Sequence, residues 1–211
     1  FVDDFASHDD AYYYFQIAWN LAHGFGSTFD RLHPTNGYQP SWCWVLAGVA
    51  RFCHVRDELL RAGAATAATL FLGAGWLLAR AAARLFHAPT ALVALALWAF
   101  FPGVERNVML EAPLHAVCFA LVIRLVADLA EAQDVRQWRR RAWVAGVAFA
   151  LLALARLDEL IVVGASGALL AVLARRRGHA LRPVPLLSRL WGPTAAVVGL
   201  YALGNRLWIG S

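Results

Sequence analysis

The sequence of 211 residues has one methionine, three cysteines and no lysine, and only 16% of its residues are charged. All 19 basic residues are therefore arginines. Soluble globular domains carry about a quarter charged residues, so the composition excludes an ordinary soluble domain. Hydrophobic residues make up 60% of the chain, and the mean hydropathy is +0.53. These values predict an integral membrane protein.

Motifs of several other protein classes are also absent. The chain has no GxGxxG loop, Walker loop or nucleotide-sugar motif. Its cysteines (Cys43, Cys53 and Cys118) lie in apolar stretches without CxxC spacing, which favours buried thiols over a metal site or a disulfide framework. The net charge of +5 comes from arginines that alternate with apolar runs, as in membrane loops, so we expect no nucleic-acid partner.

Six apolar stretches are candidate transmembrane spans: residues 60–85, 91–104, 113–129, 142–157, 160–174 and 191–208. A further stretch, residues 41–53, would reach only about 20 Å as a helix, against a hydrocarbon core of about 30 Å. We expect it to lie at the membrane interface, with a short span as the alternative. The predicted fold class is all-α: residues 1–58 form a first external loop with juxtamembrane helices, and residues 59–211 form a polytopic transmembrane helical bundle of about six spans.

The arginines predict how this bundle is oriented. If residues 41–53 do not cross the membrane, 12 of the 19 arginines lie on one side and seven on the other. Cytoplasmic loops are enriched in arginine, so the first 60 residues are expected outside the cytoplasm. We therefore expect a multi-pass protein of the inner (cytoplasmic) membrane. Most carboxylates then lie on the outer side.

The first 40 residues are the least apolar part of the chain. Ser7 and the following acidic residues predict a helix start, and Gly24 and Gly26 predict its end. Asn36-Gly37 is a turn signal, and Pro40 suits the first position of the next helix. Apolar residues repeat at helical spacing between these signals: Tyr14, Ile17, Ala18 and Leu21.

Asp9 and Asp10 have two interpretations. Carboxylates favour helix N-termini, so both could serve only as helix caps. Adjacent residues do not share a helix face, so a paired acid/base dyad is not expected; one could cap the helix while the other faces a cleft. The tyrosines that follow (Tyr12, Tyr13 and Tyr14) suit interfacial anchoring even without a substrate.

Spaced motifs in this region resemble the first external loop of GT-C glycosyltransferases, a superfamily that includes oligosaccharyltransferases, protein O-mannosyltransferases and arabinosyl and aminoarabinose transferases. The matching segments are Asp9-Asp10-Ala11-Tyr12-Tyr13-Tyr14-Phe15, Ile17-Ala18-x-Asn20, Gly24-x-Gly26-x-Thr28-Phe29-Asp30 and Thr35-Asn36-Gly37-Tyr38-Gln39-Pro40-x-Trp42. The match is densest over residues 9–42. Beyond it, the resemblance depends on the span pattern, Glu111 and Arg156-Leu157-Asp158.

The resemblance implies an integral membrane enzyme that takes a sugar from a polyprenyl-phosphate donor on the outer side of the membrane. The acceptor would be a hydroxyl of a glycan, a lipid or a protein, and direct attack would invert the anomeric carbon. Asp10 is the expected catalytic base, with Asp9 as the alternative, and Tyr13, Asn36 and Tyr38 are expected to bind substrate. Members of the superfamily are longer, so we expect this chain to be a piece of a larger enzyme whose C-terminal part is absent.

Glu111, Arg156 and Asp158 complete the predicted substrate-binding residues. Each lies in a turn between apolar stretches, where an ionisable group is costly unless it is paired. The simpler alternatives are a solvated carboxylate for Glu111 and a local ion pair of Arg156 with Asp158 or Glu159. A transporter or flippase, in which these residues line a path, and a non-catalytic lipid-binding scaffold are the rival functions.

A divalent metal ion is a candidate cofactor. Its candidate ligands are Asp9, Asp10, Glu111 and His33, because a cation could stabilise the departing phosphate. A lone histidine is more often a hydrogen-bonded surface group.

Overall fold

The computed structural model describes residues 9–100, 109–130, 134–176 and 183–208. The regular elements in these ranges are helices: α2 (Asp9–Ala22), α3 (Pro40–Ala50), α4 (Arg56–Leu85), α5 (Thr90–Ala99), α7 (Ala112–Ala130), α8 (Val135–Ala155), the 3-10 turn η1 (Leu157–Glu159), α9 (Leu160–Arg176) and α10 (Pro183–Trp208). Within the same ranges, extended pairing is limited to one bridge between Thr28 and Pro34. The all-α prediction is confirmed for the described residues.

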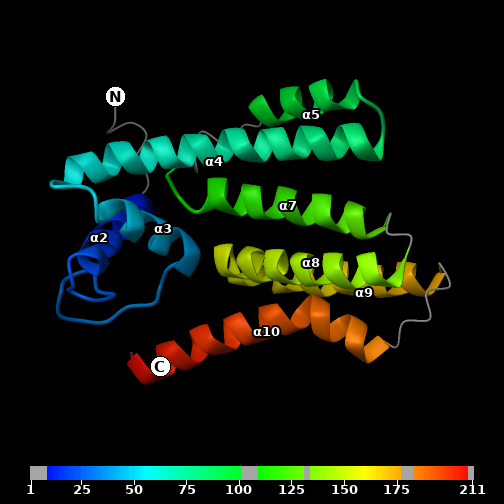
Figure 1. The fold of residues 1–211 in the computed structure, drawn as a ribbon. Helices are drawn as coiled ribbons and strands as arrows, with labels where there is room; N and C mark the ends of the chain where they lie inside the picture. The colour runs from blue at the N-terminus through cyan, green and yellow to red at the C-terminus, as the bar shows by residue number, and fades with distance from the viewer. Residues whose placement is uncertain (1–8, 101–108, 131–133, 177–182, 209–211) are drawn as a thin grey trace.

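The long helices form a bundle that α2 and α3 cover at one end (Figure 1). α7 packs between α4 and α8, α10 packs against α8, and α5 lies on the outer side of α4. α2 and α3 pack against each other at the end of the bundle where α4 begins. This arrangement places residues 9–50 beside the turns that enter α7 and α9.

The first two described helices begin and end as their sequence predicts. α2 ends at Ala22, and both Gly24 (φ 83°) and Gly26 (φ 74°) take the left-handed conformation that glycine adopts without strain. α3 starts at Pro40, whose missing backbone N–H costs nothing in the first turn. The expected cap at Ser7 lies outside the described residues.

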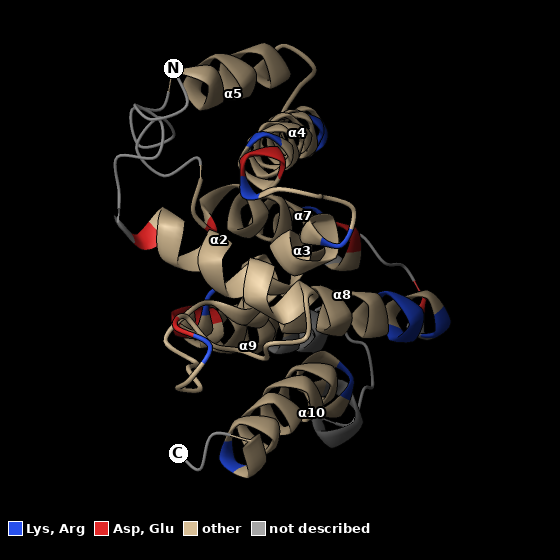
Figure 2. Ribbon diagram, turned by 90° about the vertical axis from the view of Figure 1, so that its left-hand side faces the viewer, with Lys and Arg blue, Asp and Glu red and all other residues tan. Residues whose placement is uncertain are grey.

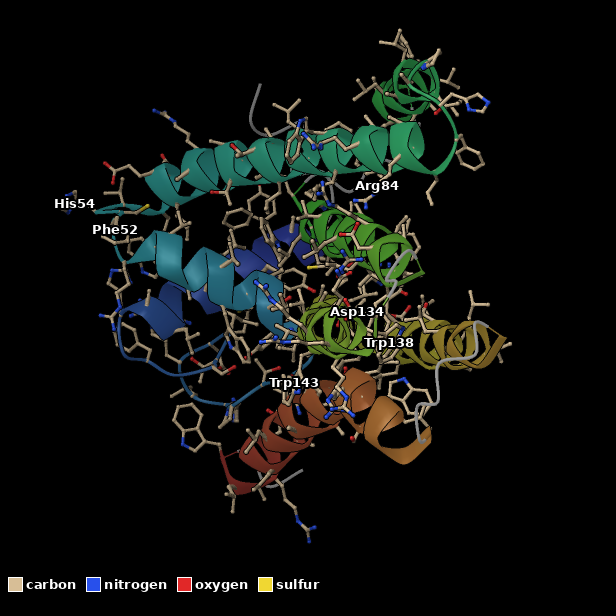
Figure 3. The ribbon with its side chains drawn as sticks, turned by 45° about the vertical axis from the view of Figure 1, so that its right-hand side comes forward. Phe52, His54, Arg84, Asp134, Trp138 and Trp143 are labelled. Atoms are coloured by element: carbon tan, nitrogen blue, oxygen red, sulfur yellow. The ribbon has the colours of Figure 1, made fainter. Side chains whose placement is uncertain are left out.

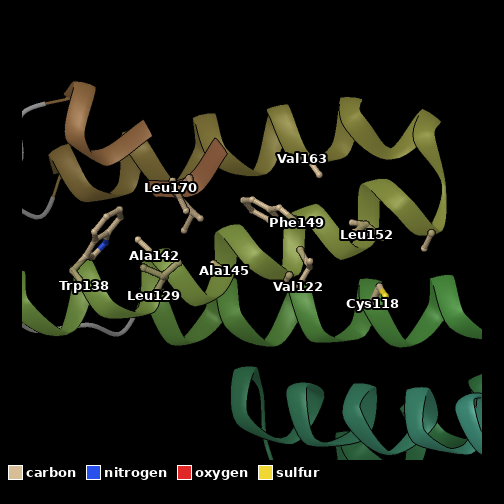
Figure 4. Packing of buried hydrophobic residues seen from close by; sticks show 13 residues of the cluster. Cys118, Val122, Leu129, Trp138, Ala142, Ala145, Phe149, Leu152, Val163 and Leu170 are labelled. Carbon is tan, nitrogen blue, oxygen red and sulfur yellow. The ribbon is translucent and has the colours of Figure 1, made fainter. Parts of the chain in front are cut away.

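One apolar core lies between α7, α8, α9 and α10 (Figure 4). Trp138, Phe149 and Leu152 of α8 are buried there against Leu129 of α7 and Leu170 of α9. Close contact between α8 and α10 depends on a glycine. A Cβ at Gly146 would meet the carbonyl oxygens of Arg189 and Leu190, and the ring of Pro193 at 3.1 Å.

Pro193 explains why a carbonyl is available at that contact. Proline has no N–H to bond the carbonyl four residues earlier, and its ring pushes that carbonyl away. The carbonyl in question belongs to Arg189 and lies over Gly146. α10 therefore continues through a proline that would ordinarily predict a helix end, and it begins at Pro183 instead of near Trp191.

A second apolar core joins α2 and α3 to the bundle. Ile17, Trp42, Leu46 and Leu59 are fully or almost fully buried, and the indole Nε1 of Trp42 donates to the carbonyl of Met109 at 3.3 Å. The first loop therefore shares its core with α4 and with the entry to α7. α4 begins three residues before the expected boundary at residue 59.

Two tryptophans pack over glycines in the same manner. Trp98 of α5 donates its indole N–H to the carbonyl of Phe71 at 3.0 Å and covers Gly75, which is four residues further along α4. Trp191 of α10 donates to the carbonyl of Val163 at 3.3 Å and covers Gly167 of α9. In both pairs the glycine lacks a Cβ, so the indole ring can reach a backbone carbonyl that lies within the neighbouring helix, four residues before the glycine.

Each candidate span coincides with a described helix, and residues 101–104 of the second span lie outside the described part. Two of these helices are long and apolar enough to cross a membrane: α4, and residues Ala112–Leu129 within α7. By the same measure the remaining described helices are too short or too polar. The short α3 agrees with the expectation that residues 41–53 do not form a full-length span.

Candidate functional site

Tyr14 connects three distant parts of the sequence. Its hydroxyl donates to Glu111 Oε2 at 3.2 Å and accepts from the backbone N–H of Gln39 at 2.9 Å. Tyr14 is 6% exposed. Burial is the main cause that raises its pKa above the ordinary value, and the negative charge of Glu111 raises it further. The hydroxyl therefore stays protonated and can donate to the carboxylate.

A second pair lies one helical turn further along α7. His115 Nε2 and Glu159 Oε1 are 2.8 Å apart, with the two side chains 23% and 15% exposed. Glu111 directly precedes α7, and the N–H of His115 four residues later donates to its carbonyl at 2.9 Å, so both side chains lie on one side of the helix start. The Gln39 side chain completes the connection, because its Oε1 accepts from the backbone N–H of Leu157 at 3.3 Å.

We call Tyr14, Gln39, Glu111, His115 and Glu159 the polar ring. Its hydrogen bonds run from α2 to Glu111 at the entry to α7, from α7 to η1, and from η1 through Gln39 back to α2. The ring therefore fixes the first loop, the start of α7 and the turn before α9 relative to one another.

Arg156 and Asp158 lie at the edge of the ring. The guanidinium donates to both carboxylate oxygens, from Nε and from Nη2 at 3.2 Å each, and the two side chains are 42% and 61% exposed. This bond lowers the pKa of Asp158 and raises that of Arg156, and the charges of Glu111 and Glu159 add to the rise at Arg156. The local ion pair that was the simpler interpretation is thus formed, within electrostatic reach of the ring.

Asp10 lies in the first turn of α2 and is exposed. It precedes Tyr14 by four residues, so the two residues lie on one face of α2. Within the described part of the chain, Asp10 makes no hydrogen bond or ion pair. Asp9 is the first residue of α2, and its side chain lies outside the described part.

The other predicted substrate-binding residues lie in and beside the loop between α2 and α3. The Tyr13 hydroxyl bonds to Thr35 Oγ1 at 2.7 Å, and its ring stacks on Phe29. The Tyr38 hydroxyl bonds to Ser27 Oγ at 2.6 Å, and burial raises its pKa to about 12. Asn36 is exposed, and its carbonyl accepts from the N–H of Tyr38.

Tyr38 faces a different space from the polar ring. It lines a cavity of about 590 Å³ together with Trp44 of α3, Leu154 of α8, and Tyr201 and Leu200 of α10. The structure therefore brings Glu111, Arg156 and Asp158 together, whereas Tyr13, Asn36 and Tyr38 form a separate group.

Asn20 holds the loop in place. It is fully buried, and its Nδ2 donates to the carbonyls of Thr28 and Phe29 at 2.9 and 3.0 Å. Its Oδ1 accepts from Nε of Arg31, a residue in the left-handed conformation at φ 66°. A buried polar residue needs such partners, so Asn20 supports the loop.

The candidate metal ligands are not gathered. His33 contacts Asp30, with 2.6 Å between Nδ1 and Oδ2, and this bond is the largest of the causes that lower the pKa of Asp30. Glu111 contacts Tyr14 instead. Among the described residues, no group of three or more His, Cys, Asp and Glu side chains could hold a metal ion. A metal site at Asp9 remains a prediction, and no step proposed below depends on a metal.

The end of the bundle away from the site is basic. The sequence Val135–Ala155 places Arg136, Arg139, Arg140 and Arg141 in the first turns of α8, which appear as a blue group in Figure 2. Arg84 near the end of α4 pairs with Asp128 of α7. In Figure 3, Arg84, Asp134 and Trp138 lie toward this end, and Phe52 and His54 lie at the end with α2 and α3.

Sequence analysis missed four members of the polar ring: Tyr14 and Gln39 as bridging groups, and His115 and Glu159 as a pair. Two signals were available. His115 is an ionisable residue in an apolar helix, and it lies four residues after a predicted site residue. Comparison with known protein families, with curated proteins and with solved structures found no match.

Proposed function

We propose that this chain belongs to a GT-C-type membrane glycosyltransferase, which transfers a sugar from a polyprenyl-phosphate donor to an acceptor hydroxyl. The observation that carries the proposal is the polar ring. It joins the residues of three separate segments of the resemblance: the Asp10–Tyr14 segment, Glu111 and the Arg156–Asp158 turn. A structural role alone does not require ionisable residues from three segments at one place.

The surface supports a membrane setting with several spans. Large apolar side chains face outward along the bundle helices, where a soluble protein would present polar residues: Leu72, Leu92, Leu97, Trp143, Ile161, Leu169, Leu200 and Leu203. The arginine-rich start of α8 suits the cytoplasmic side, and in this proposal the polar ring at the opposite end belongs to the outer interface. A lipid-linked phosphate would lie at that depth.

The proposed chemistry divides into two tasks. Asp10 accepts the proton of the acceptor hydroxyl as its oxygen attacks the anomeric carbon, a role that requires an ionised, accessible carboxylate. The bond from the anomeric carbon to the phosphate oxygen breaks, and the phosphate leaves as an anion. Arg156 binds that phosphate, because a guanidinium offers parallel N–H donors to two oxygens. Its exposed pairing with Asp158 costs little to exchange.

The polar ring keeps these two groups in fixed positions. Tyr14 ties the helix that carries Asp10 to α7, and Glu159 ties the turn that carries Arg156 to the same helix. Prealigned groups avoid an entropic cost during the reaction.

Asp10→Asn in the full-length protein tests the proposal directly. Transfer from a panel of polyprenyl-phosphate sugars should fall by about 10²–10⁴-fold, because the variant keeps the size of the side chain and loses the proton acceptor. Asp57→Asn is the matched control, since Asp57 is an exposed carboxylate in the first turn of another helix, α4. Wild-type turnover in Asp10→Asn would refute the role of Asp10. Movement of the donor lipid without sugar transfer by the wild type would favour the flippase, and lipid binding without either activity would favour the scaffold.

A further inference from the structure

We propose that His115 and Glu159 are positioning residues for Arg156: their bond fixes the turn that carries the guanidinium and so sets how well it meets the donor phosphate. This inference extends the proposed function and depends on it for the identity of the ligand. Neither residue belongs to the motifs that led to the functional hypothesis.

The turn has few other restraints. Arg156 breaks the helical path between α8 and α9 with an extended backbone (φ −150°, ψ 118°), and η1 is only three residues long. In the described part of the chain, side chains of other elements reach it in two places, at Leu157 N and at Glu159 Oε1. The first bond is 3.3 Å long and uses a neutral amide, whereas the second is 2.8 Å long and joins two ionisable groups. Bonds to charged groups are the stronger kind.

The geometry of the turn transmits this restraint to Arg156. The backbone N–H of Glu159 donates to the carbonyl of Arg156 at 3.1 Å, so the two residues close the same three-residue turn. Fixing Glu159 against α7 therefore fixes the edge of the turn from which Arg156 projects. α7 is a rigid reference because Cys118, Ala120 and Val122, just beyond His115, are buried in the bundle.

The other charged groups near His115 do not replace this bond. Glu111, four residues earlier and just before α7, is engaged by Tyr14, and Asp158 is engaged by Arg156. The ring of Phe119 lies against His115 at 6.0 Å between centroids and offers no hydrogen bond.

The test compares His115→Ala, His115→Gln and Glu159→Ala in the full-length protein. The side-chain amide that His115→Gln introduces would place a donor close to the position of Nε2, so this variant should keep donor KM within about 3-fold of wild type. His115→Ala should raise donor KM by about 10-fold or more, the loss typical when an outer hydrogen-bond partner is removed, with a much smaller change in kcat and acceptor KM. His87→Ala is the control, because His87 is an exposed histidine between α4 and α5.

A double variant shows whether the two residues act together. His115→Ala with Glu159→Ala should raise donor KM no more than the more severe single variant, because either change alone already removes the bond. Additive effects would overturn the proposal. Equal donor KM in wild type and His115→Ala, or a lower melting temperature with unchanged donor KM, would also overturn it. If His115→Ala does not fold, the same criteria apply to Glu159→Ala.

A measurement without turnover separates this proposal from the function that it extends. Hydrogen exchange of the amides of residues 157–160 should be faster in His115→Ala than in wild type and close to wild type in His115→Gln. If the wild-type protein neither transfers sugar nor binds a polyprenyl phosphate in nanodiscs, the proposed function fails and the phosphate role of Arg156 fails with it. The exchange data then still decide whether His115 fixes the turn, and unchanged exchange in His115→Ala overturns that part.

Discussion

The hydroxyl of Tyr14 is the best place to test the polar ring, because Tyr14→Phe removes one atom and keeps the buried ring. The change deletes the bond to Glu111 and the bond from the N–H of Gln39. A hydrogen bond to a charged group contributes about 1.5–3 kcal/mol, and a neutral one about 0.5–1.5 kcal/mol. Together they predict a loss of about 2–4 kcal/mol in the free energy of unfolding.

This loss is large enough to measure as a melting temperature. For a domain of this size, each kcal/mol shifts the melting temperature by about 2–4 °C, so we expect Tyr14→Phe to melt about 5–15 °C below wild type. Tyr12→Phe is the matched control: Tyr12 is 43% exposed and neighbours Tyr14 on the same helix, and surface changes usually stay within about 0.5 kcal/mol. Circular dichroism in the same detergent would compare all three proteins.

The pH dependence gives a second readout of the same hydroxyl. A raised pKa in the folded protein means that the stabilisation by Tyr14 is complete below the ordinary tyrosine pKa of about 10 and is lost as pH rises toward the folded pKa. The difference in stability between wild type and Tyr14→Phe should therefore be constant near neutral pH and shrink above about pH 10. Tyr38, whose pKa is also raised, is present in both proteins and does not affect the difference. Equal melting of Tyr14→Phe and Tyr12→Phe at neutral pH would refute the ring as a stabilising contact.

Three further predictions concern Arg156, the membrane orientation and helix packing. Arg156→Lys should raise donor KM with little change in melting temperature, because the ion pair of Arg156 with Asp158 is exposed. Arg156→Ala should raise donor KM further. A large loss of stability with unchanged kinetics would make Arg156 purely structural. In a Cys53→Ser background, Leu32→Cys should react with an impermeant thiol reagent from outside intact cells and Arg140→Cys should not, and the reverse pattern would overturn the orientation. Gly146→Ala should lower the free energy of unfolding by about 1–3 kcal/mol in a urea titration, because its Cβ has no room against α10. Gly164→Ala, which has open space around it, should leave the free energy of unfolding unchanged. Equal effects of the two variants would contradict the packing of α8 on α10.

The fold could be predicted from local signals wherever one residue decides the backbone. Gly24, Gly26 and Pro40 mark where α2 ends and α3 begins because their φ angles are constrained or uniquely permitted. At Pro193 the helix continues through a proline, as the span predicted over residues 191–208 requires, and Gly146 on another helix leaves room for the displaced carbonyl. That compensation is tertiary and leaves no signal near Pro193 in the sequence.

The site was predicted in part for the same reason. Glu111, Arg156 and Asp158 stand out as charges in apolar surroundings, which a sequence displays directly. The bridges between them join residues 97, 118 and 44 positions apart, so no local spacing reveals them. The helical spacing does put Tyr14 on the apolar face of its helix, and Tyr14 is buried there, but the spacing does not reveal what its hydroxyl bonds.

The tryptophans that cover Gly75 and Gly167 have a consequence for how the chain assembles. Each pair joins helices that follow one another along the chain, α4 with α5 and α9 with α10. Turning one helix by a single residue rotates its side chains by about 100°. Such a rotation would break the bond between the indole N–H and the carbonyl of the neighbouring helix, and it would place the indole ring against a residue that has a Cβ. In the proposed membrane setting, apolar surfaces give little preference for one rotation over another, whereas a directional hydrogen bond favours one. Each hairpin can therefore acquire its final rotation as soon as its two helices have left the ribosome, before the remainder of the bundle is present.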